Sequence, residues 1–318
     1  MAEIITIGEI LVEVMAKHVG QKFDTTGEFI GPFPSGAPAI FIDQARKTGS
    51  SSAIVSTVGN DGFGQINIER LKQDGVDVRF IRTVAEKTTG IAFVTYKENG
   101  DRDFIFTIKD SAAACITRDD VKEQIFENCK YYHIMGCSAF NEEMIAAIKK
   151  AVGIARANNA QISFDPNIRK ELMENEKIKE FIDFALHTCD IFLPGEDELK
   201  WITGIWDEKE AIRSVMEKGI RYVVVKRGKK GCTVYENESS FDIDPYEVTE
   251  VDPTGAGDCF AGTLVSLLNQ GKSIYEAAQF ANAAGAYAVT KKGPMEGTAT
   301  LDELQEFMNY IGGTTKCL

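Results

Sequence analysis

Residues 252–258 read Asp-Pro-Thr-Gly-Ala-Gly-Asp, and apolar residues at helical spacing follow them at Phe260, Leu264, Leu267 and Leu268. Three consecutive small residues at 255–257 would leave the first backbone N–H groups of this helix uncovered. Such donors bind anions, helped by the positive end of the helix dipole. Phosphoryl transfer needs these donors beside a carboxylate that accepts the proton of the attacking hydroxyl, and Asp258 stands at that position.

The same segment also has a structural interpretation, in which the glycines form a turn and Asp258 stabilises the first turn of the helix. Two other phosphate motifs fail. Gly271-Lys272-Ser273 has the ending of a Walker A loop, but residue 266 is Ser. A dinucleotide fingerprint would start at Gly255, but residue 260 is Phe and no adequate strand leads in. The segment alone leaves the structural and the phosphate-binding interpretations open.

Strand and helix patterns alternate along most of the chain. Strands are expected at Ile4–Ile7, 10–15, 53–58, Tyr131–Met135, 161–164, 191–193, Tyr222–Lys226 and 232–235. Helices are expected at 36–48, 64–74, 141–157, 176–187, 196–218, 257–270, 273–290 and 301–311. Alternation of this kind predicts βαβ units and a mostly parallel sheet covered on both faces.

A hairpin interrupts this alternation. Strand patterns at 91–96 and 102–107 flank Asn99-Gly100, which is a type I′ turn signal. We therefore expect one α/β domain over residues 1–318 that carries a small β lid, formed by approximately residues 10–34 and 89–110.

Composition narrows the class of protein. A formal net charge of −13 disfavours nucleic acid or an anionic membrane as a partner, because either would require a basic surface. No apolar stretch approaches the ~18 residues of a membrane span. The seven cysteines include no Cys-x-x-Cys, which favours reduced thiols over a zinc cluster. Since residues 1–10 also lack a signal-peptide pattern, we expect a cytoplasmic protein.

Further segments of characteristic composition occur along the chain, in this order: Gly36-Ala37-Pro38-Ala39, 58–64, 164–169, 226–231 and 281–286. Together with residues 252–258 they resemble the ribokinase-like sugar kinases, the PfkB family, over essentially the whole chain. Each segment alone is a weak signal, but their shared order is specific. The resemblance favours the phosphate-binding interpretation of residues 252–258.

The resemblance implies an α/β fold, a ribokinase-like three-layer α/β/α sandwich with a mostly parallel central sheet of about nine strands and a small β-sheet lid over the sugar. It implies an ATP-dependent carbohydrate kinase, a phosphotransferase with an alcohol group as acceptor. Asp258 would be the catalytic base, and the backbone N–H groups of Gly255, Ala256 and Gly257 would form the anion hole.

Binding residues follow from the same resemblance. ATP is expected at Asn167, Lys226, Gly228, Gly231, Gly255, Gly257, Asn282 and Gly285. The sugar is expected to contact Glu13, Gly36, Arg102, Arg169 and Asp258. Mg²⁺ is expected near Glu198 through water, and candidate ligands for K⁺ are Asp252 and the carbonyl of Thr254.

Three positions depart from the family pattern. Ile40 stands where an Asn would bind the sugar, and Gly195 stands where an Asn would accompany Glu198. Glu13 replaces an Asp and is one methylene longer. We expect a homodimer formed through the lid, because an exposed β insertion has edges and an apolar face to cover.

The acceptor is left open. Kinases for 2-keto-3-deoxygluconate commonly have an Arg where this chain has Ile108, although Arg102 and Arg169 are substitutes for pairing with the carboxylate. This favours an uncharged ketohexose such as fructose or tagatose, with 2-keto-3-deoxygluconate as the alternative. A nucleoside kinase and a non-catalytic sugar-binding regulator are further alternatives, because fold alone does not establish function.

Overall fold

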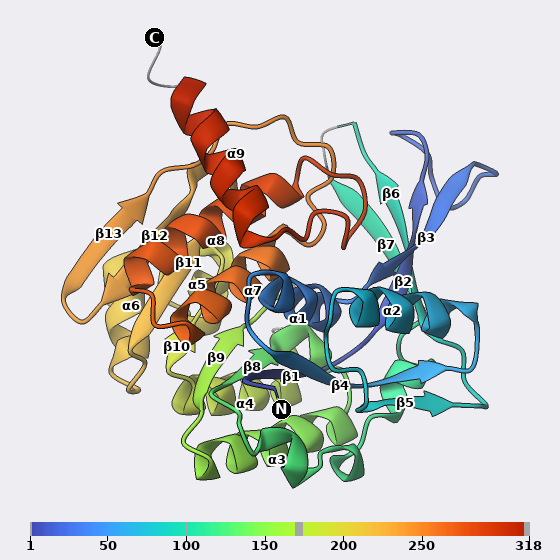
Figure 1. Ribbon diagram of the computed structural model, residues 1–318, viewed down its shortest axis with the longest axis horizontal. Helices are drawn as coiled ribbons and strands as arrows, with labels where there is room; N and C mark the ends of the chain where they lie inside the picture. Colours follow the sequence, from blue (N-terminus) through green and yellow to red (C-terminus); the bar gives the residue numbers. More distant parts are fainter. Residues whose placement is uncertain (1, 99–100, 169–173, 315–318) are drawn as a thin grey trace.

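A nine-stranded sheet crosses the part of the protein that the computed structural model describes, residues 2–98, 101–168 and 174–314 (Figure 1). In spatial order its strands are β13 (Ser239–Ile243), β12 (Cys232–Glu236), β11 (Tyr222–Lys226), β10 (Ile191–Phe192), β9 (Gln161–Asp165), β8 (Tyr131–Met135), β1 (Ile4–Ile7), β4 (Ser52–Gly59) and β5 (Ile81–Val84). The strands from β11 to β5 are parallel, and β12 and β13 add an antiparallel edge. The mostly parallel sheet confirms the predicted fold class.

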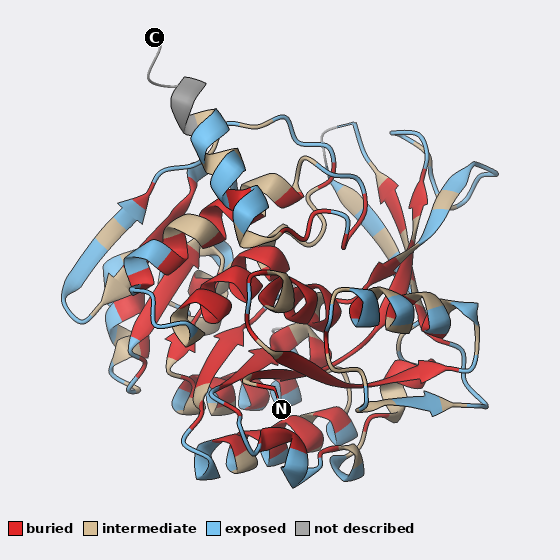
Figure 2. Ribbon diagram, in the orientation of Figure 1, coloured by how far each residue is buried: buried red, intermediate tan, exposed pale blue. Residues whose placement is uncertain are grey.

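Helices cover both faces of this sheet. One face carries α1 (Ala37–Lys47), α2 (Gly62–Gln73), α7 (Ala256–Asn269), α8 (Ile274–Ala288) and α9 (Leu301–Thr314), and the other carries α3 (Glu142–Ala157), α4 (Glu176–Thr188), α5 (Glu196–Thr203) and α6 (Glu208–Met216). Each face has its own apolar core, and Figure 2 shows the buried residues concentrated in the strands and on the inner sides of the helices. Every residue of β1 and β4 is buried, as expected for parallel strands covered on both faces.

A second sheet of four strands projects from one end of the molecule (Figure 1). We call it the small sheet. Its strands, in order, are β3 (Phe29–Ser35), β2 (Leu11–Ala16), β6 (Gly90–Tyr96) and β7 (Arg102–Phe106). The residue ranges predicted for the lid fall on these strands, while the predicted turn at Asn99-Gly100 lies outside the described residues.

Two expectations about the elements were wrong. The single helix expected over 196–218 is two helices, because Gly204 ends α5 in the left-handed conformation with φ of 69°. Strands β3, β5 and β13 were not expected. β3 contains Gly31, Pro32 and Pro34, which weaken a strand pattern but are tolerated at the edge of a sheet.

None of the helices in the described ranges has the length and hydropathy that a membrane span requires.

Candidate active site

The first turn of α7 carries backbone N–H groups that no side chain among the described residues caps, and the N–H of Ala256 makes a long hydrogen bond of 3.5 Å to the carbonyl of Pro253. Gly255 is its N-cap residue with φ of 81°, and no side chain caps it. A Cβ on Gly255 would lie 2.5 Å from the carbonyl oxygen of Pro294, so both the conformation and the space require glycine. The following residues, Ala256 and Gly257, line a cavity. This helix N-terminus is therefore able to bind an anion that enters the cavity.

Asp258 lies on the same turn with only 7% of its surface exposed. Burial raises the pKa of Asp258 well above its usual value, as do the nearby charges of Asp165, Glu9 and Glu13, while Lys226 opposes them. The Asn167 side-chain amide donates to Oδ1 of Asp258 over 3.3 Å. A raised pKa suits a carboxylate that must accept a proton near neutral pH.

The C-terminal end of β9 brings a second carboxylate to the site. Lys226 Nζ lies 2.5 Å from Oδ2 of Asp165, which is 1% exposed. The Asn167 N–H donates to the other oxygen of Asp165 over 3.2 Å, and Asn167 has the left-handed φ of 41° that turns its amide towards Asp258. Lys226 Nζ is also 3.7 Å from the position of a Cβ on Gly257. A positive charge is thus held beside the helix N-terminus.

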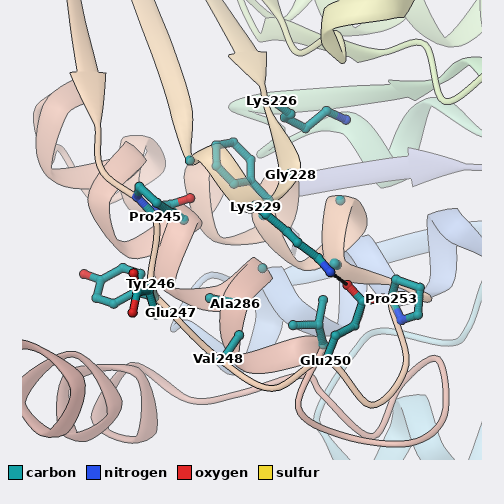
Figure 3. A pocket seen from close by; sticks show the side chains of 17 residues that line it. Lys226, Gly228, Lys229, Pro245, Tyr246, Glu247, Val248, Glu250, Pro253 and Ala286 are labelled. Carbon is teal, nitrogen blue, oxygen red and sulfur yellow. Dashed lines mark ion pairs between the residues drawn. The ribbon is translucent and has the colours of Figure 1, made fainter. Parts of the chain in front are cut away.

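A cavity of about 480 Å³ opens on this side of α7, within the usual range for small-molecule sites (Figure 3). Its walls contain many of the residues predicted to bind ATP: Lys226, Gly228, Gly231, Gly257, Asn282 and Gly285. Asn282 donates from Nδ2 to the carbonyl of Asp244 over 2.7 Å, which anchors the connection from β13 to α7 along the cavity. In Figure 3 an ion pair of 3.3 Å between Lys229 and Glu250 joins two sides of this cavity.

Buried carboxylates also lie on the side of the small sheet. Glu13 on β2 is 6% exposed; its Oε1 accepts a 2.8 Å hydrogen bond from Ser35, and its Oε2 has no hydrogen-bond partner among the described residues. Burial raises the pKa of Glu13 to about 7. Gly36 caps α1 with φ of 115°, and a Cβ there would lie 2.5 Å from the backbone oxygen of Glu9. Glu9 itself is buried and accepts a 2.6 Å hydrogen bond from Ser138.

A hydrogen-bonded loop precedes α7. Asp252 Oδ1 accepts from the backbone N–H and the hydroxyl of Thr254, over 3.1 Å and 2.8 Å, and its Oδ2 accepts from the N–H of Gly293 over 3.1 Å. Arg102 from β7 donates to Thr254 Oγ1 over 2.7 Å. The two residues predicted as K⁺ ligands therefore face each other, and Arg102 lies against one of them.

Other predicted positions have different surroundings. Glu198 accepts the N–H of Ile168 over 2.8 Å and the N–H of Gly195 over 2.7 Å, so its two oxygens bind backbone between β9 and α5. Ile40 is buried against Gly255, 3.4 Å from the position of a Cβ on that glycine. Arg169 lies outside the described residues.

Glu9 and Asp165 were not singled out as site residues from the sequence. Asp165 belongs to the 164–169 segment, whose buried strand ending in Asp could have indicated it. Glu9 follows Gly8 at the break between β1 and β2, a weaker signal. Within the described residues no group of three or more His, Cys, Asp or Glu side chains could hold a metal ion. Mg²⁺ carried on phosphate oxygens and waters needs no such group. Asp165 and Glu198 are acidic side chains whose charges act on Lys226.

The chain is similar to known proteins over nearly its whole length. Residues 1–301 match the profile of the pfkB family carbohydrate kinases. Fructokinase-1 of Oryza sativa subsp. japonica is 30% identical over 314 residues, covering 96% of this chain and 97% of its own length. Fructokinase-2 of the same organism is 29% identical over 315 residues, covering 96% of this chain and 94% of its own.

Solved structures are similar over the whole fold. A candidate ribokinase II from E. coli, in complex with ATP and Mg²⁺, is 48% identical with a TM-score of 0.94, covering 98% of this chain and 100% of its own. A fructokinase double mutant from Vibrio cholerae O395, bound to fructose, ADP and potassium ion, is 26% identical with a TM-score of 0.85. This alignment covers 96% of the present chain and 98% of that fructokinase. The ribokinase-like fold expected from the motifs is confirmed.

Proposed function

Because the chain belongs to the pfkB family of carbohydrate kinases, which transfer a phosphoryl group to a sugar hydroxyl, we propose that it phosphorylates a ketohexose of the fructose class with ATP. One observation carries the mechanistic part of this proposal. The buried carboxylate of Asp258 shares the first turn of α7 with N–H groups that no side chain caps, next to residues that line the cavity and within reach of the charges of Glu9 and Glu13.

The proposed reaction is an in-line displacement. Asp258 accepts the proton of the acceptor hydroxyl as the new bond forms between that oxygen and the γ-phosphorus. The bond between the γ-phosphorus and the β–γ bridging oxygen breaks, and ADP leaves. The N–H groups at 255–257 and the Lys226 ammonium stabilise the charge on the phosphoryl oxygens.

ATP would lie along the cavity, with Asn282 and Gly285 at its wall and Lys226 near the phosphates. Bound Mg²⁺ would neutralise phosphate charge, with Asp165 and Glu198 as the acidic residues that hold its waters. A K⁺ ion would be held by Asp252 and the carbonyl of Thr254. The E. coli relative with ATP and Mg²⁺ and the Vibrio cholerae relative with potassium support these assignments.

A neutral acceptor is favoured by the charges around the site. Glu9, Glu13 and Asp258 are buried acidic groups that supply no positive charge for the carboxylate of a sugar acid, and a buried charge without a cationic partner is costly. Arg102, a candidate partner for that carboxylate, already donates to Thr254. The curated fructokinases among the relatives support fructose, and the E. coli relative adds ribose as a second acceptor to test.

The direct test is ADP release with Mg-ATP and K⁺ in the presence of fructose, tagatose, ribose, 2-keto-3-deoxygluconate or adenosine. Fructose should be the strongest acceptor. A response confined to the sugar acid or to adenosine would reject the ketohexose proposal. ATP binding without ADP release for any acceptor would favour the non-catalytic sugar-binding regulator.

The role of Asp258 has its own test. Asp258→Asn keeps the side-chain shape but cannot accept the proton, so kcat should fall by about 10²–10⁴-fold while the Kd for ATP stays within about two-fold. The control is Asp183→Asn on the exposed surface of α4, which should leave both values unchanged. Turnover of Asp258→Asn near that of the unmodified protein would remove Asp258 from the mechanism.

We also propose that a second copy of the chain covers the small sheet. Phe29, Ile105 and Phe106 are 36%, 48% and 46% exposed on its two edge strands, β3 and β7. Edge strands with exposed apolar side chains favour pairing with another chain. Light scattering after gel filtration should give the mass of a dimer, and Ile105→Lys should shift it towards the monomer. A monomeric unmodified protein would reject this proposal.

A further inference from the structure

Two residues of the small sheet reach the loop that precedes α7. We call residues 252–257, which include this loop and the first two residues of α7, the anion-hole loop. Tyr96 and Arg102 are directly opposed on β6 and β7, so their side chains share one face of the small sheet. Arg102 Nη1 donates to Thr254 Oγ1 over 2.7 Å, and the Tyr96 hydroxyl lies 3.5 Å from Oδ2 of Asp252. These contacts join parts of the chain that are far apart in sequence.

The contacted threonine is itself fixed inside the loop. Its hydroxyl donates to Asp252 Oδ1 and accepts from Arg102, so one donor and one acceptor function are both used. Thr254 immediately precedes Gly255, whose left-handed conformation begins α7. A rotation of Thr254 would therefore change the direction of the N–H groups that follow it.

We propose that Arg102 is a positioning residue that aligns the anion-hole loop with the acceptor. This inference rests on the function proposed above. β6 pairs with β2 as well as with β7, and Glu13 on β2 stands opposite Ala92 on β6. The small sheet thus carries both a carboxylate on the acceptor side and the arginine that holds Thr254. One structural unit fixes the acceptor relative to the phosphoryl-binding N–H groups.

The geometry explains why the residue is an arginine. The guanidinium carbon of Arg102 lies 5.3 Å from the ring centroid of Phe104, so the aromatic face supports the planar group while Nη1 points to Thr254. A lysine ammonium lacks the planar fork and has a different set of donors. Arg102→Lys should therefore keep the charge and lose most of the alignment.

The test is a double-mutant cycle with Arg102→Met, Thr254→Val and the combined variant. Each single change should lower kcat by about 10- to 100-fold, as a small misplacement of reacting groups does, with the KM for ATP within about two-fold. The combined variant should be no slower than the slower single variant, because both changes remove one interaction. Arg79→Met is the control, since Arg79 is exposed and pairs with Asp77 away from the small sheet.

Two kinetic outcomes would overturn the proposal. Additive losses in the combined variant would mean that the two residues act independently. A higher KM for the sugar in Arg102→Met, with kcat unchanged, would make Arg102 a direct sugar contact instead. Thr254→Ser keeps the hydroxyl and should retain kcat within about three-fold, which checks that the valine effect comes from the lost hydrogen bond.

A measurement without substrates separates this inference from the proposed function. Arg102→Met should speed deuterium exchange of the backbone amides at 252–258, and Thr254→Val should speed exchange at 90–98 on the small sheet. These changes are expected whether or not any tested sugar is phosphorylated. Exchange unchanged in both variants would overturn the proposal even if the unmodified protein is an active kinase.

Discussion

The carboxylate of Glu13 should make the folded protein less stable as the pH rises. Its pKa is raised from 4.5 to about 7 by burial on β2. The folded state therefore keeps the Glu13 proton longer than the unfolded chain does. This unfavourable contribution is absent below pH 4.5, grows between pH 4.5 and 7, and is complete above pH 7. At about 1.4 kcal/mol for each pH unit between the two values, it reaches about 3 kcal/mol.

Glu13→Gln removes this pH dependence. Gln retains an oxygen to accept the hydrogen bond that Ser35 donates to Oε1. Its NH₂ group replaces Oε2, which has no hydrogen-bond partner in the part of the chain that the structure describes, and leaving that donor unpaired costs about 1–3 kcal/mol at every pH. The stability of the variant relative to the unmodified protein should therefore start negative near pH 5 and rise by about 2–3 kcal/mol by pH 8.

Thermal unfolding followed by tryptophan fluorescence from pH 5 to 8.5, without sugar or nucleotide, measures this difference. At roughly 2 °C per kcal/mol for a chain of this size, the difference in Tm should rise by about 4–6 °C across the range. Glu143→Gln on the exposed surface of α3 is the matched control and should show a flat difference. A flat difference for Glu13→Gln as well would refute the reasoning, whatever its sign.

Three further changes test the site from other sides. Gly255→Ala places a Cβ 2.5 Å from the Pro294 carbonyl, so kcat should fall by about 10²-fold or more. The control Gly204→Ala has a similar φ of 69° with open space around the new Cβ and should leave kcat unchanged. Equal kcat values for the two variants would contradict the anion-hole assignment. Lys226→Met removes a charge that lowers the pKa of Asp258, so the acidic limb of the pH profile of kcat/KM should move to higher pH. An unmoved limb would mean that Lys226 does not influence the pKa of the catalytic base. Gly285→Val narrows the cavity and should raise the KM for ATP about ten-fold, with little change in the KM for the sugar. The control Gly153→Val on α3 should change neither KM. An unchanged KM for ATP in Gly285→Val would place the nucleotide elsewhere.

Most strands of the nine-stranded sheet and most helices that cover it could be predicted, because the apolar residues that they bury are close together in the sequence. β8 and β11 have the predicted bounds, Tyr131–Met135 and Tyr222–Lys226, since each is an apolar run covered on both faces. β3 could not be predicted in this way. It is a strand because β2 pairs with it, while its own glycine and prolines argue against one.

The candidate site likewise contains residues that the sequence could indicate and residues that it could not. Asp258 and the glycines before it could be found because they lie within one short motif. The sequence could not show that Glu9 and Asp165 act on the pKa of Asp258, since that proximity depends on the ends of distant strands meeting. The sequence also could not show that Ile40 packs against Gly255. From the sequence, Ile40 was expected only to remove a hydrogen bond to the sugar.

The packing of α1 against α7 also constrains how the protein is made. Gln44 Nε2 on α1 donates to Thr263 Oγ1 on α7 over 2.9 Å, and the buried face of α1, with Ile40 and Phe41, belongs to the same core as α7 and α8. During synthesis on the ribosome, α1 therefore cannot pack against α7 and α8 until residues 256–288 have been synthesised. At typical elongation rates this interval is on the order of tens of seconds. The part of α1 that packs against α7 is uncovered during this interval, so we expect the nascent chain to bind chaperones that shield apolar surfaces.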